Sequence, residues 1–260
     1  MRISPAQHFN AENSLRILGR AREDAFGKEI NLLVWNIQKA RRRNWFADFN
    51  DLCHGQNLVI LQEAVANSAH DSYFENGNTF EWIMARSFRN RHTGIETGVK
   101  TGGTAQSINP ASIFSPHTEP LLNTSKLVLS TRYRLAHSDD LLLVLNVHAV
   151  NFVSLRKYLS QLDQLVEEID VHQGPIILAG DFNTWRPKRY RQFEQIALQA
   201  GLKEAVMERN KRLQHLNQHL DHVYYRDLEL IEIRSLDQIN SSDHFPISVK
   251  FETETSPKKS

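Results

Sequence analysis

Short apolar runs recur along this chain of 260 residues, and most of them have the length of β-strands. Valine, isoleucine, leucine and aromatic residues, which favour extended structure, make up most of each run. The runs that we predict as strands are residues 32–35, 58–61, 82–85, 127–129, 141–147, 176–179, 222–225, 228–233 and 247–251. Several follow one another with only a turn between them, which a purely parallel βαβ fold does not produce.

Apolar residues at helical spacing occupy some of the intervals between these strands. The predicted helices cover residues 45–52, residues 155–169 with Ser154 as the N-cap, and residues 193–200 with Gly201 as the C′ residue. A short helix is also expected near the start, where Leu15, Leu18, Ala21 and Ala25 have helical spacing. Strands interleaved with helices in this way predict packed sheets with helices on their outer faces.

The chain is long enough for one large domain or two small ones, but it shows no internal repeat and no linker, so we expect one domain. Residues 31–252 would form it, with residues 1–30 as an extension that packs on it. Residues 253–260 are charged and are expected to be a flexible tail. Residues 92–103 are rich in glycine and threonine, without an apolar period, and are predicted as a loop.

Composition excludes several classes of protein. The net charge of +1 does not favour a generic polyanion binder, so affinity for nucleic acid would have to come from local patches. The single cysteine, Cys53, rules out an internal disulfide and cysteine-rich zinc sites. No apolar run reaches the ~20 residues that span a bilayer, and the first residues lack an apolar signal core. We therefore expect a cytoplasmic protein without membrane insertion, and no obligate protein partner is evident.

Polar side chains follow the ends of several apolar runs. Asn36 follows the run at 32–35 directly, Glu63 follows the run at 58–61 after Gln62, and Asp181 and Asn183 follow the run at 176–179. Oxygen ligands of this kind suit a hard divalent cation such as Mg²⁺ or Mn²⁺, so a shared metal and phosphoester site is one interpretation. The other is structural: Glu63 would begin an exposed loop, and Asp181 with Asn183 would form an Asx turn.

Histidines add a second kind of chemistry. His244 follows Asp243 just before the last predicted strand, and Asp221 is a candidate to hold its imidazole in one tautomer. His148 lies near the end of an apolar strand, between Asn146 and Asn151. A histidine there is often a satisfied core residue, but the crowding of polar residues favours a functional role.

Taken together and in order, six segments resemble the motifs of the endonuclease/exonuclease/phosphatase superfamily. They are Trp-Asn-Ile at 35–37, Leu-Gln-Glu at 61–63, Asn-Val-His at 146–148, Gly-Asp-Phe-Asn at 180–183, Leu-Asp-His at 220–222 and Ser-Asp-His at 242–244. The resemblance covers about residues 32–251, and further residues resemble a bacterial branch, the YafD-like proteins. The superfamily includes AP endonucleases, pancreatic-type deoxyribonuclease, neutral sphingomyelinases and inositol-polyphosphate 5-phosphatases. Gln38 stands where AP endonucleases usually carry aspartate, which weakens an AP-site reading.

The resemblance implies a four-layer α/β/β/α sandwich of two packed mixed sheets flanked by helices, with the site at one end. It implies that Glu63 binds Mg²⁺ or Mn²⁺ directly and that Asn36 and Asp243 help to hold the ion. Asp181 would orient or deprotonate the attacking water, and Asn183 would contact the phosphate.

The remaining catalytic roles also follow from the resemblance. His244, oriented by Asp221, would stabilise the transition state, and His148 would donate to a phosphoryl oxygen or to the leaving group. Lys126 falls where many relatives place a phosphate-binding residue, although a lysine at the start of a strand is equally ordinary.

Two basic and aromatic clusters follow motif residues, at 39–45 and 185–191. Within them Arg41, Arg42, Trp185 and Arg186 are candidates to contact a phosphate backbone or to stack on a base. The structural alternative is a solvated helix start, and Trp45 fits the core face of its helix.

The leading hypothesis is therefore a divalent-metal-dependent phosphoesterase, with a nuclease as the preferred form. The alternative is the same chemistry on a phospholipid headgroup or a small phosphorylated metabolite. A more remote alternative is a non-catalytic binding protein with the same fold.

Overall fold

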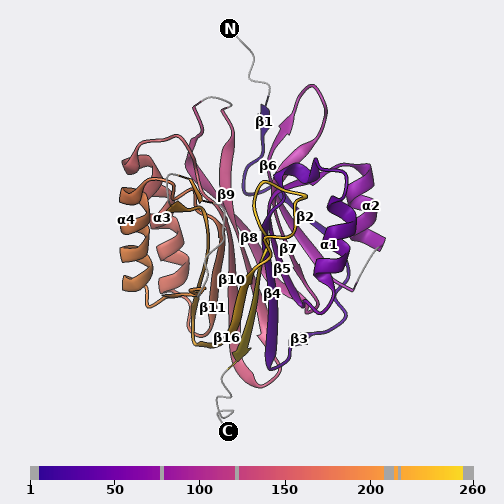
Figure 1. Cartoon of the computed structure of the whole chain (residues 1–260), viewed down its shortest axis with the longest axis vertical. Coiled ribbons are helices and arrows are strands. Elements are labelled where there is room, and N and C mark those ends of the chain that lie inside the picture. The colour runs from indigo at the N-terminus through magenta and orange to yellow at the C-terminus, as the bar shows by residue number, and fades with distance from the viewer. Residues whose placement is uncertain (1–5, 77–78, 121–122, 208–213, 216–217, 254–260) are drawn as a thin grey trace.

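A computed structural model of the chain describes residues 6–76, 79–120, 123–207, 214–215 and 218–253. Two β-sheets lie face to face at the centre of the molecule, and a pair of helices covers the outer face of each sheet (Figure 1). This is the four-layer α/β/β/α sandwich expected from the sequence, and the predicted fold class is confirmed.

The first sheet is mixed, because β4 and β5 run parallel whereas its other neighbours are antiparallel. Its strand order is β1 (Ala6–His8), β6 (Glu81–Asn90), β7 (Glu96–Gly103), β5 (Leu58–Ala66), β4 (Glu29–Asn36), β17 (Ile247–Thr253) and β16 (Leu228–Ser235), with β2 (Leu15–Gly19) also paired to β6.

The second sheet is mixed as well, with β10 and β11 parallel at its centre. Its strand order is β12 (Lys203–Glu204), β15 (Asp221–Arg226), β11 (Ile176–Asp181), β10 (Ser138–His148), β9 (Ser125–Leu135) and β3 (Ala25–Phe26), with β8 (Ser107–Thr118) also paired to β9. A separate short pair is formed by β13 (Gln214–His215) and β14 (Gln218–His219).

Helices α1 (Trp45–Cys53) and α2 (Ser68–Asn76) cover the first sheet, and α3 (Leu155–Asp170) and α4 (Pro187–Gln199) cover the second (Figure 1). The predicted end signals of α3 and α4 are present. The side chain of Ser154 accepts a hydrogen bond from the backbone N–H of Lys157, and Gly201 takes a φ of 74° directly after α4. A short 3₁₀ turn, η1 (Gln38–Ala40), follows β4.

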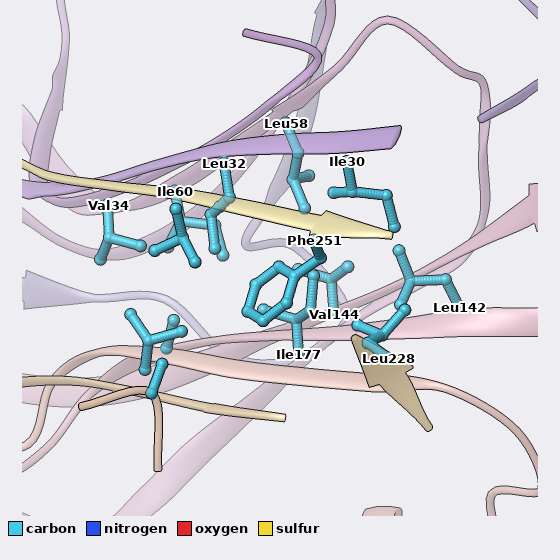
Figure 2. Close-up of a cluster of buried hydrophobic side chains, with 14 of the residues drawn as sticks. Ile30, Leu32, Val34, Leu58, Ile60, Leu142, Val144, Ile177, Leu228 and Phe251 are labelled. Carbon is cyan, nitrogen blue, oxygen red and sulfur yellow. The ribbon is translucent and has the colours of Figure 1, made fainter. Parts of the chain in front are cut away.

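The main core lies between the two sheets. It is built from alternate residues of the central strands, because successive side chains of a strand point to opposite faces (Figure 2). The inward residues include Ile30, Leu32 and Val34 of β4, Leu58 and Ile60 of β5, Leu142 and Val144 of β10, Ile177 of β11 and Phe251 of β17. The intervening residues pack outward against the helices.

Two predictions of secondary structure were wrong. Residues 15–25 do not form a helix, because Leu15–Gly19 pairs with β6 at the side of the first sheet. Residues 92–103 are not a loop throughout, since Glu96–Gly103 is the buried strand β7. Its glycines serve close packing: a Cβ on Gly102 would lie 2.3 Å from the Trp82 ring.

Most of the expected C-terminal tail, residues 254–260, lies outside the described residues, and Thr253 is the last residue of β17. Within the described part of the chain, no helix is both long and apolar enough to cross a lipid bilayer.

Candidate active site

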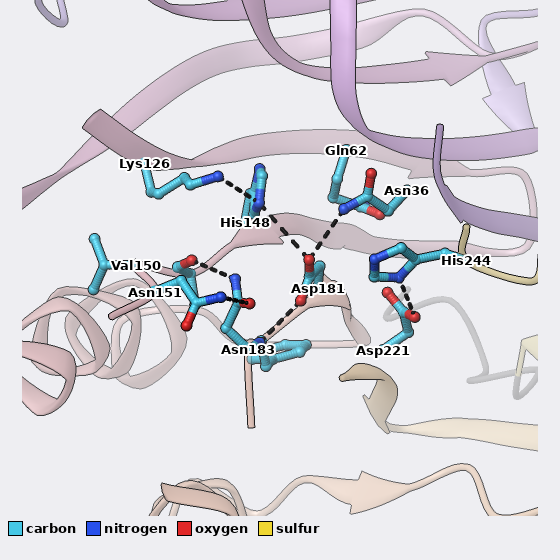
Figure 3. Close-up of polar contacts among 12 residues, drawn as sticks. Asn36, Gln62, Lys126, His148, Val150, Asn151, Asp181, Asn183, Asp221 and His244 are labelled. Carbon is cyan, nitrogen blue, oxygen red and sulfur yellow. Dashed lines mark hydrogen bonds and ion pairs between the residues drawn. The ribbon is translucent and has the colours of Figure 1, made fainter. Parts of the chain in front are cut away.

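Strand alternation brings the predicted polar residues to one end of the space between the sheets. Asn36 continues the inward-facing series of β4, and Asp181 continues that of β11. His148 does the same for β10 and Asp221 for β15, and both pair with Asp181 in the sheet register. The polar side chains at the ends of these four strands, which belong to two sheets, therefore lie close together (Figure 3).

Asp181 lies at the centre of this group and is 3% exposed. Its Oδ2 accepts a hydrogen bond of 3.0 Å from the Asn36 amide, and its Oδ1 accepts one of 2.9 Å from the backbone N–H of Asn183 (Figure 3). Burial raises the pKa of Asp181 to about 6, and the charge of His244 only partly opposes it. The carboxylate is thus oriented from two sides and is more basic than an ordinary aspartate.

Gly180 makes the position of Asp181 possible. Its φ is 139°, and a Cβ there would lie 2.1 Å from the carbonyl oxygen of Val147 on the parallel neighbour β10. Glycine alone lets the two strands approach this closely in this conformation. The same Cβ would also lie 3.0 Å from the side-chain nitrogen of Gln62, which is fully buried.

Glu63 reaches the site through a β-bulge. The register of β5 with β7 shifts between Leu61 and Ala64, and Glu63 takes a left-handed φ of 49°. Because of the extra residue, Gln62 stays on the inward face while Ala64 packs on the helix side. The half-buried Glu63 then lines a pocket of about 90 Å³ beside the polar group, together with Lys39, Glu119, Lys126 and His148.

His244 and Asp221 form a buried ion pair, with His244 Nδ1 2.7 Å from Asp221 Oδ2 (Figure 3). Burial opposes the charged imidazole, but the carboxylate of Asp221 outweighs it and raises the pKa of His244 to about 10. His244 is therefore a cation at neutral pH, and its charge is directed toward the Asp181 region.

His148 has the opposite character. Burial, reinforced by the positive charge of Lys126, holds its pKa well below the usual range. Lys126 Nζ lies 2.8 Å from His148 Nε2, so this nitrogen accepts the hydrogen bond and the proton of the neutral ring is on Nδ1. Lys126 also lies 3.6 Å from Glu119, which fixes the ammonium between a carboxylate and an imidazole.

Two loops at the site are joined through Asn151. Its side-chain amide donates to Asn183 Oδ1 over 2.7 Å, and its Oδ1 accepts from the indole of Trp185 over 2.7 Å. Its backbone N–H donates to Glu119. Asn183, whose own amide donates to the Ala149 carbonyl, takes a left-handed φ of 51°. The loop after β10 and the loop after β11 are therefore joined by a network of hydrogen bonds.

The remaining predicted residues lie farther from Asp181. Asp243 is exposed and accepts a hydrogen bond of 2.8 Å from Gln38, close to Asn36 in the chain. Arg41 and Arg42 are exposed, and Arg42 donates to the carbonyl of Asn240. Arg186 is exposed and stacks on the half-buried Trp185, with its guanidinium carbon 4.4 Å from the ring centroid.

Arg189 belongs to the basic run at 185–191 but does not face solvent. This residue is 1% exposed and donates to the carbonyls of Val150, Val153 and Asn183. A buried guanidinium must satisfy its donors within the protein. Its hydrogen bonds therefore link the loop after β10 to the loop after β11. A basic run in the sequence carries no signal for this difference.

Sequence reasoning missed Lys39 and Glu119 as pocket residues. Lys39 has a left-handed φ of 62° in η1, and its pKa is lowered by burial against the opposing charge of Glu63. In the sequence, Asn146 belonged to the Asn-Val-His segment and to a crowded strand end, but no role was predicted for it. It binds across the sheets, accepting from Gln62 and donating to the Leu61 and Lys100 carbonyls.

The donor set fits a divalent cation near Glu63. Among the described residues, the Glu63 side chain forms no hydrogen bond or ion pair, and it lies against a pocket lined by polar groups. Ligand atoms of Asp181, Asp221 and His244 also lie within 4.8 Å of one another. We favour Glu63 and Asn36 as ligands, because His244 is a cation already engaged by Asp221.

Comparison with known proteins identifies relatives of the chain. A sequence profile described as Endonuclease/Exonuclease/phosphatase family matches residues 33–244. A UPF0294 protein of Vibrio parahaemolyticus is 35% identical over 225 residues, which cover 86% of this chain and 78% of the relative. A UPF0294 protein of Yersinia pseudotuberculosis is 34% identical over 229 residues, covering 86% of this chain and 84% of the relative. The UPF0294 proteins are the YafD family, so the resemblance inferred from the sequence is confirmed.

Solved structures share the fold at low sequence identity. An endonuclease/exonuclease/phosphatase from Bacteroides vulgatus has a TM-score of 0.67 at 13% identity, covering 87% of this chain and 99% of the other. The human Nocturnin catalytic domain with bound sulfate anion has a TM-score of 0.64 at 16% identity, covering 92% and 98%.

Proposed function

The chain belongs to the endonuclease/exonuclease/phosphatase family, and we propose that it is a divalent-metal-dependent phosphodiesterase that acts on nucleic acid. Members of this family are metal-dependent phosphoesterases and nucleases. The proposal goes further than family membership, because it names the bond that is cleaved, the class of substrate and the residues that act.

One observation carries the proposal. Asp181, a buried carboxylate with a raised pKa, is held by Asn36 and Asn183 beside the cationic His244. A base and a fixed positive charge at this spacing suit hydrolysis of an anionic ester, in which water loses a proton while negative charge develops on phosphorus.

Each residue then has a stated task. Asp181 orients the water and takes its proton, which its pKa of about 6 favours near neutral pH. His244 stabilises the charge that develops on the phosphoryl oxygens, and Asp221 keeps the imidazole protonated and aimed. Asn183 positions the phosphate from the opposite side.

Lys126 and His148 complete the proposed phosphate site. The ammonium of Lys126 lies at the pocket wall and neutralises an anionic oxygen. A phosphate that binds the Lys126 ammonium would free His148 Nε2, which faces Asp181 at 3.7 Å, and the neutral ring would then carry its single proton on Nε2 and donate it to a phosphoryl oxygen or to the leaving group. Burial and the neighbouring ammonium keep this imidazole from gaining a second proton, so it suits a hydrogen-bond donor better than a base.

Glu63, Asn36 and Asp243 would hold Mg²⁺ or Mn²⁺, which when bound supplies positive charge for the scissile phosphate. All three offer oxygen ligands, which these cations prefer, and Glu63 faces the same pocket as Lys126.

Nucleic acid is favoured as substrate by the surroundings of the pocket. Lys39 lines both this pocket and a neighbouring groove of about 210 Å³, which is also lined by Arg41, Asn67 and Asn90. Arg186 and Trp185 stand at the opposite loop pair. A polyanion that extends past the scissile phosphate would meet positive charge on both sides.

The test is cleavage of end-labelled single- and double-stranded DNA and RNA in Mg²⁺ and in Mn²⁺. We expect cleavage that chelator abolishes and that Asp181→Ala lowers by about 10²–10⁴-fold. Asp139→Ala, which removes an exposed aspartate near the far end of β10, is the matched control and should retain activity. Cleavage of small phosphoesters or phospholipids alone would overturn the nuclease assignment, and inactivity toward every phosphoester would favour a binding protein.

A further inference from the structure

An aromatic ledge stands beside the candidate active site. We define it as Phe152, Trp185 and Arg186. Phe152 is 60% exposed, and its ring centroid lies 6.2 Å from that of Trp185. Arg186 stacks on the Trp185 ring at 4.4 Å. The ledge therefore combines two aromatic rings with one guanidinium, all on the loops that follow β10 and β11.

The ledge is rigidly connected to the catalytic group. Asn151 Oδ1 accepts hydrogen bonds from the Trp185 indole over 2.7 Å and from the backbone N–H of Phe152 over 2.8 Å. The same residue donates to Asn183, whose backbone N–H donates to Asp181. These hydrogen bonds thus fix the position of the ledge relative to the proposed phosphate site.

Folding alone does not account for Phe152. Its φ of 53° is a left-handed conformation that bulky side chains rarely adopt, and its ring remains mostly in solvent. The residue bears backbone strain without the burial that normally offsets it. Strained, exposed residues of this kind concentrate at ligand sites.

We propose that the ledge stacks an unpaired nucleobase next to the scissile phosphate, so that the preferred substrate is single-stranded or frayed nucleic acid. The inference rests on the proposed function and specifies its substrate class. A base offers a flat π-face to Phe152 and Trp185, and its phosphate offers charge to Arg186. Bases inside an intact duplex have both faces covered, so they reach the ledge only after unstacking.

A lipid surface fits the ledge less well. Phe152 is the only large apolar side chain exposed by more than a third in the described loops at 149–154 and 182–186, and its neighbour Trp185 carries the Arg186 guanidinium on its ring. The other exposed large apolar residues lie on other segments and are Ile17, Phe46, Val171, Leu198, Val206 and Ile231. A single exposed apolar ring next to a guanidinium suits a base better than a bilayer.

Intrinsic fluorescence tests the contact without relying on catalysis. The chain has four tryptophans, and Trp35, Trp45 and Trp82 are buried, whereas Trp185 is half-buried. In the Asp181→Ala background, in which turnover should be strongly slowed, a ten-nucleotide single strand should quench fluorescence. An abasic strand with the same number of phosphates should not. Trp185→Phe should remove the quenching.

Substitution of Phe152 supplies the matched comparison. Phe152→Ala should weaken binding of the normal strand at least about fivefold, which corresponds to loss of one stacked base, and should leave abasic binding unchanged. Phe152→Trp should keep the affinity for the normal strand, because tryptophan also offers an aromatic ring for stacking. Val171→Ala is the control, because Val171 is 74% exposed and lies at the far end of α3, whose 16 residues span about 24 Å.

The outcomes separate the two proposals. Equal binding of normal and abasic strands, with metal-dependent cleavage intact, would overturn the ledge and leave the nuclease standing. No cleavage of any nucleic acid would overturn the proposed function itself. Loss of binding to anionic phospholipid vesicles in Phe152→Ala, without any effect on strands, would assign the ledge to a lipid surface instead.

Discussion

At the scale of single residues, the candidate site contains several residues whose burial or backbone conformation is unfavourable for folding. Asp181 is a carboxylate removed from water, and Glu63 and Phe152 have left-handed backbones. Each arrangement is unfavourable by itself and is maintained by its neighbours. Substitutions that relieve such unfavourable arrangements should therefore separate stability from activity.

We expect Asp181→Asn to make the apoprotein more stable at high pH while abolishing most of its activity. Burial raises the pKa of Asp181 to about 6, so the folded state prefers the protonated form. The favourable contribution of that proton is fully present below the unfolded value near 3.8 and is lost as the pH rises through about 6.

The free energy of unfolding in urea, with chelator present, should therefore be higher for Asp181→Asn than for the natural chain at pH 8. The expected gain is at most about 3 kcal/mol, from a shift of roughly two pKa units. At pH 4.5 the two proteins should differ much less. A difference that does not change with pH would contradict the proposed environment of Asp181.

Glu63→Gln should weaken metal binding without unfolding the protein. Glu63 is half-buried at the pocket, and its side chain has no hydrogen bond or ion pair among the described residues, so the amide replaces it without breaking a contact. Added Mn²⁺ should raise the melting temperature of the natural chain but not that of the variant. Glu119→Gln, which removes the ion pair with Lys126, is a control that should keep the metal-dependent rise. An equal rise in all three proteins would place the ion elsewhere.

At the scale of secondary-structure elements, a close backbone approach between β10 and β11 constrains the site. A Cβ at Gly180 would lie 2.1 Å from the Val147 carbonyl oxygen, and the φ of 139° is unsuited to other residues. We expect Gly180→Ala to lower the free energy of unfolding by more than about 1 kcal/mol and to reduce activity by displacing Asp181.

Gly27→Ala is the matched control for that substitution. A Cβ at Gly27 meets nothing within 4 Å and its φ is not left-handed, so alanine there should be neutral or slightly stabilising. Urea unfolding of both variants makes the comparison. Equal effects of the two alanines would show that the approach of β10 and β11 is less strict than described.

The sequence predicted those elements whose signal is local. Continuous apolar runs identified β10 and β11, and the spacing of apolar residues identified α3. Strand β7 was missed because its glycines, which permit contact with Trp82, resemble those of a loop. The apolar spacing of residues 15–25 resembled a helix, whereas pairing with β6 made Leu15–Gly19 a strand.

In the candidate site, too, features that depend on contacts between distant segments could not be predicted from the sequence. Its central residues could be identified from motif order, but the sequence does not encode the bulge that turns Glu63 inward, because that depends on register against β7. Nor does it separate Arg186, which is exposed, from Arg189, which is buried under the same loops. Those distinctions arise only when distant segments pack.

At the scale of the whole molecule, the net charge of +1 makes local charge decisive for binding. Arg41 and Arg186 are both exposed; Arg41 lines the groove that shares Lys39 with the pocket, and Arg186 stacks on Trp185 in the loop after β11. Removing both by Arg41→Ala and Arg186→Ala should reduce the slope of log affinity against log salt by about 1.4, at roughly 0.7 per lost phosphate contact on a single strand.

The control is Arg22→Ala, which removes an exposed arginine beside Asn57, at the opposite end of β5 from Glu63. Its salt dependence should equal that of the natural chain. An unchanged slope in the double variant, measured by titration of a labelled single strand, would exclude these two arginines from the binding surface.

The hydrogen bonds of Asn146 bear on how the protein loses activity in denaturant. Asn146 belongs to the second sheet and binds the Leu61 and Lys100 carbonyls of the first, beside a candidate site whose proposed metal ligand Glu63 and proposed base Asp181 come from different sheets. A sliding of one sheet past the other by a few tenths of an ångström would separate Glu63 from Asp181 and leave every strand intact. Catalytic turnover should therefore fall in mild denaturant before the far-ultraviolet circular dichroism signal changes. Turnover would then report the alignment of the two sheets, whereas circular dichroism reports only the strands and helices.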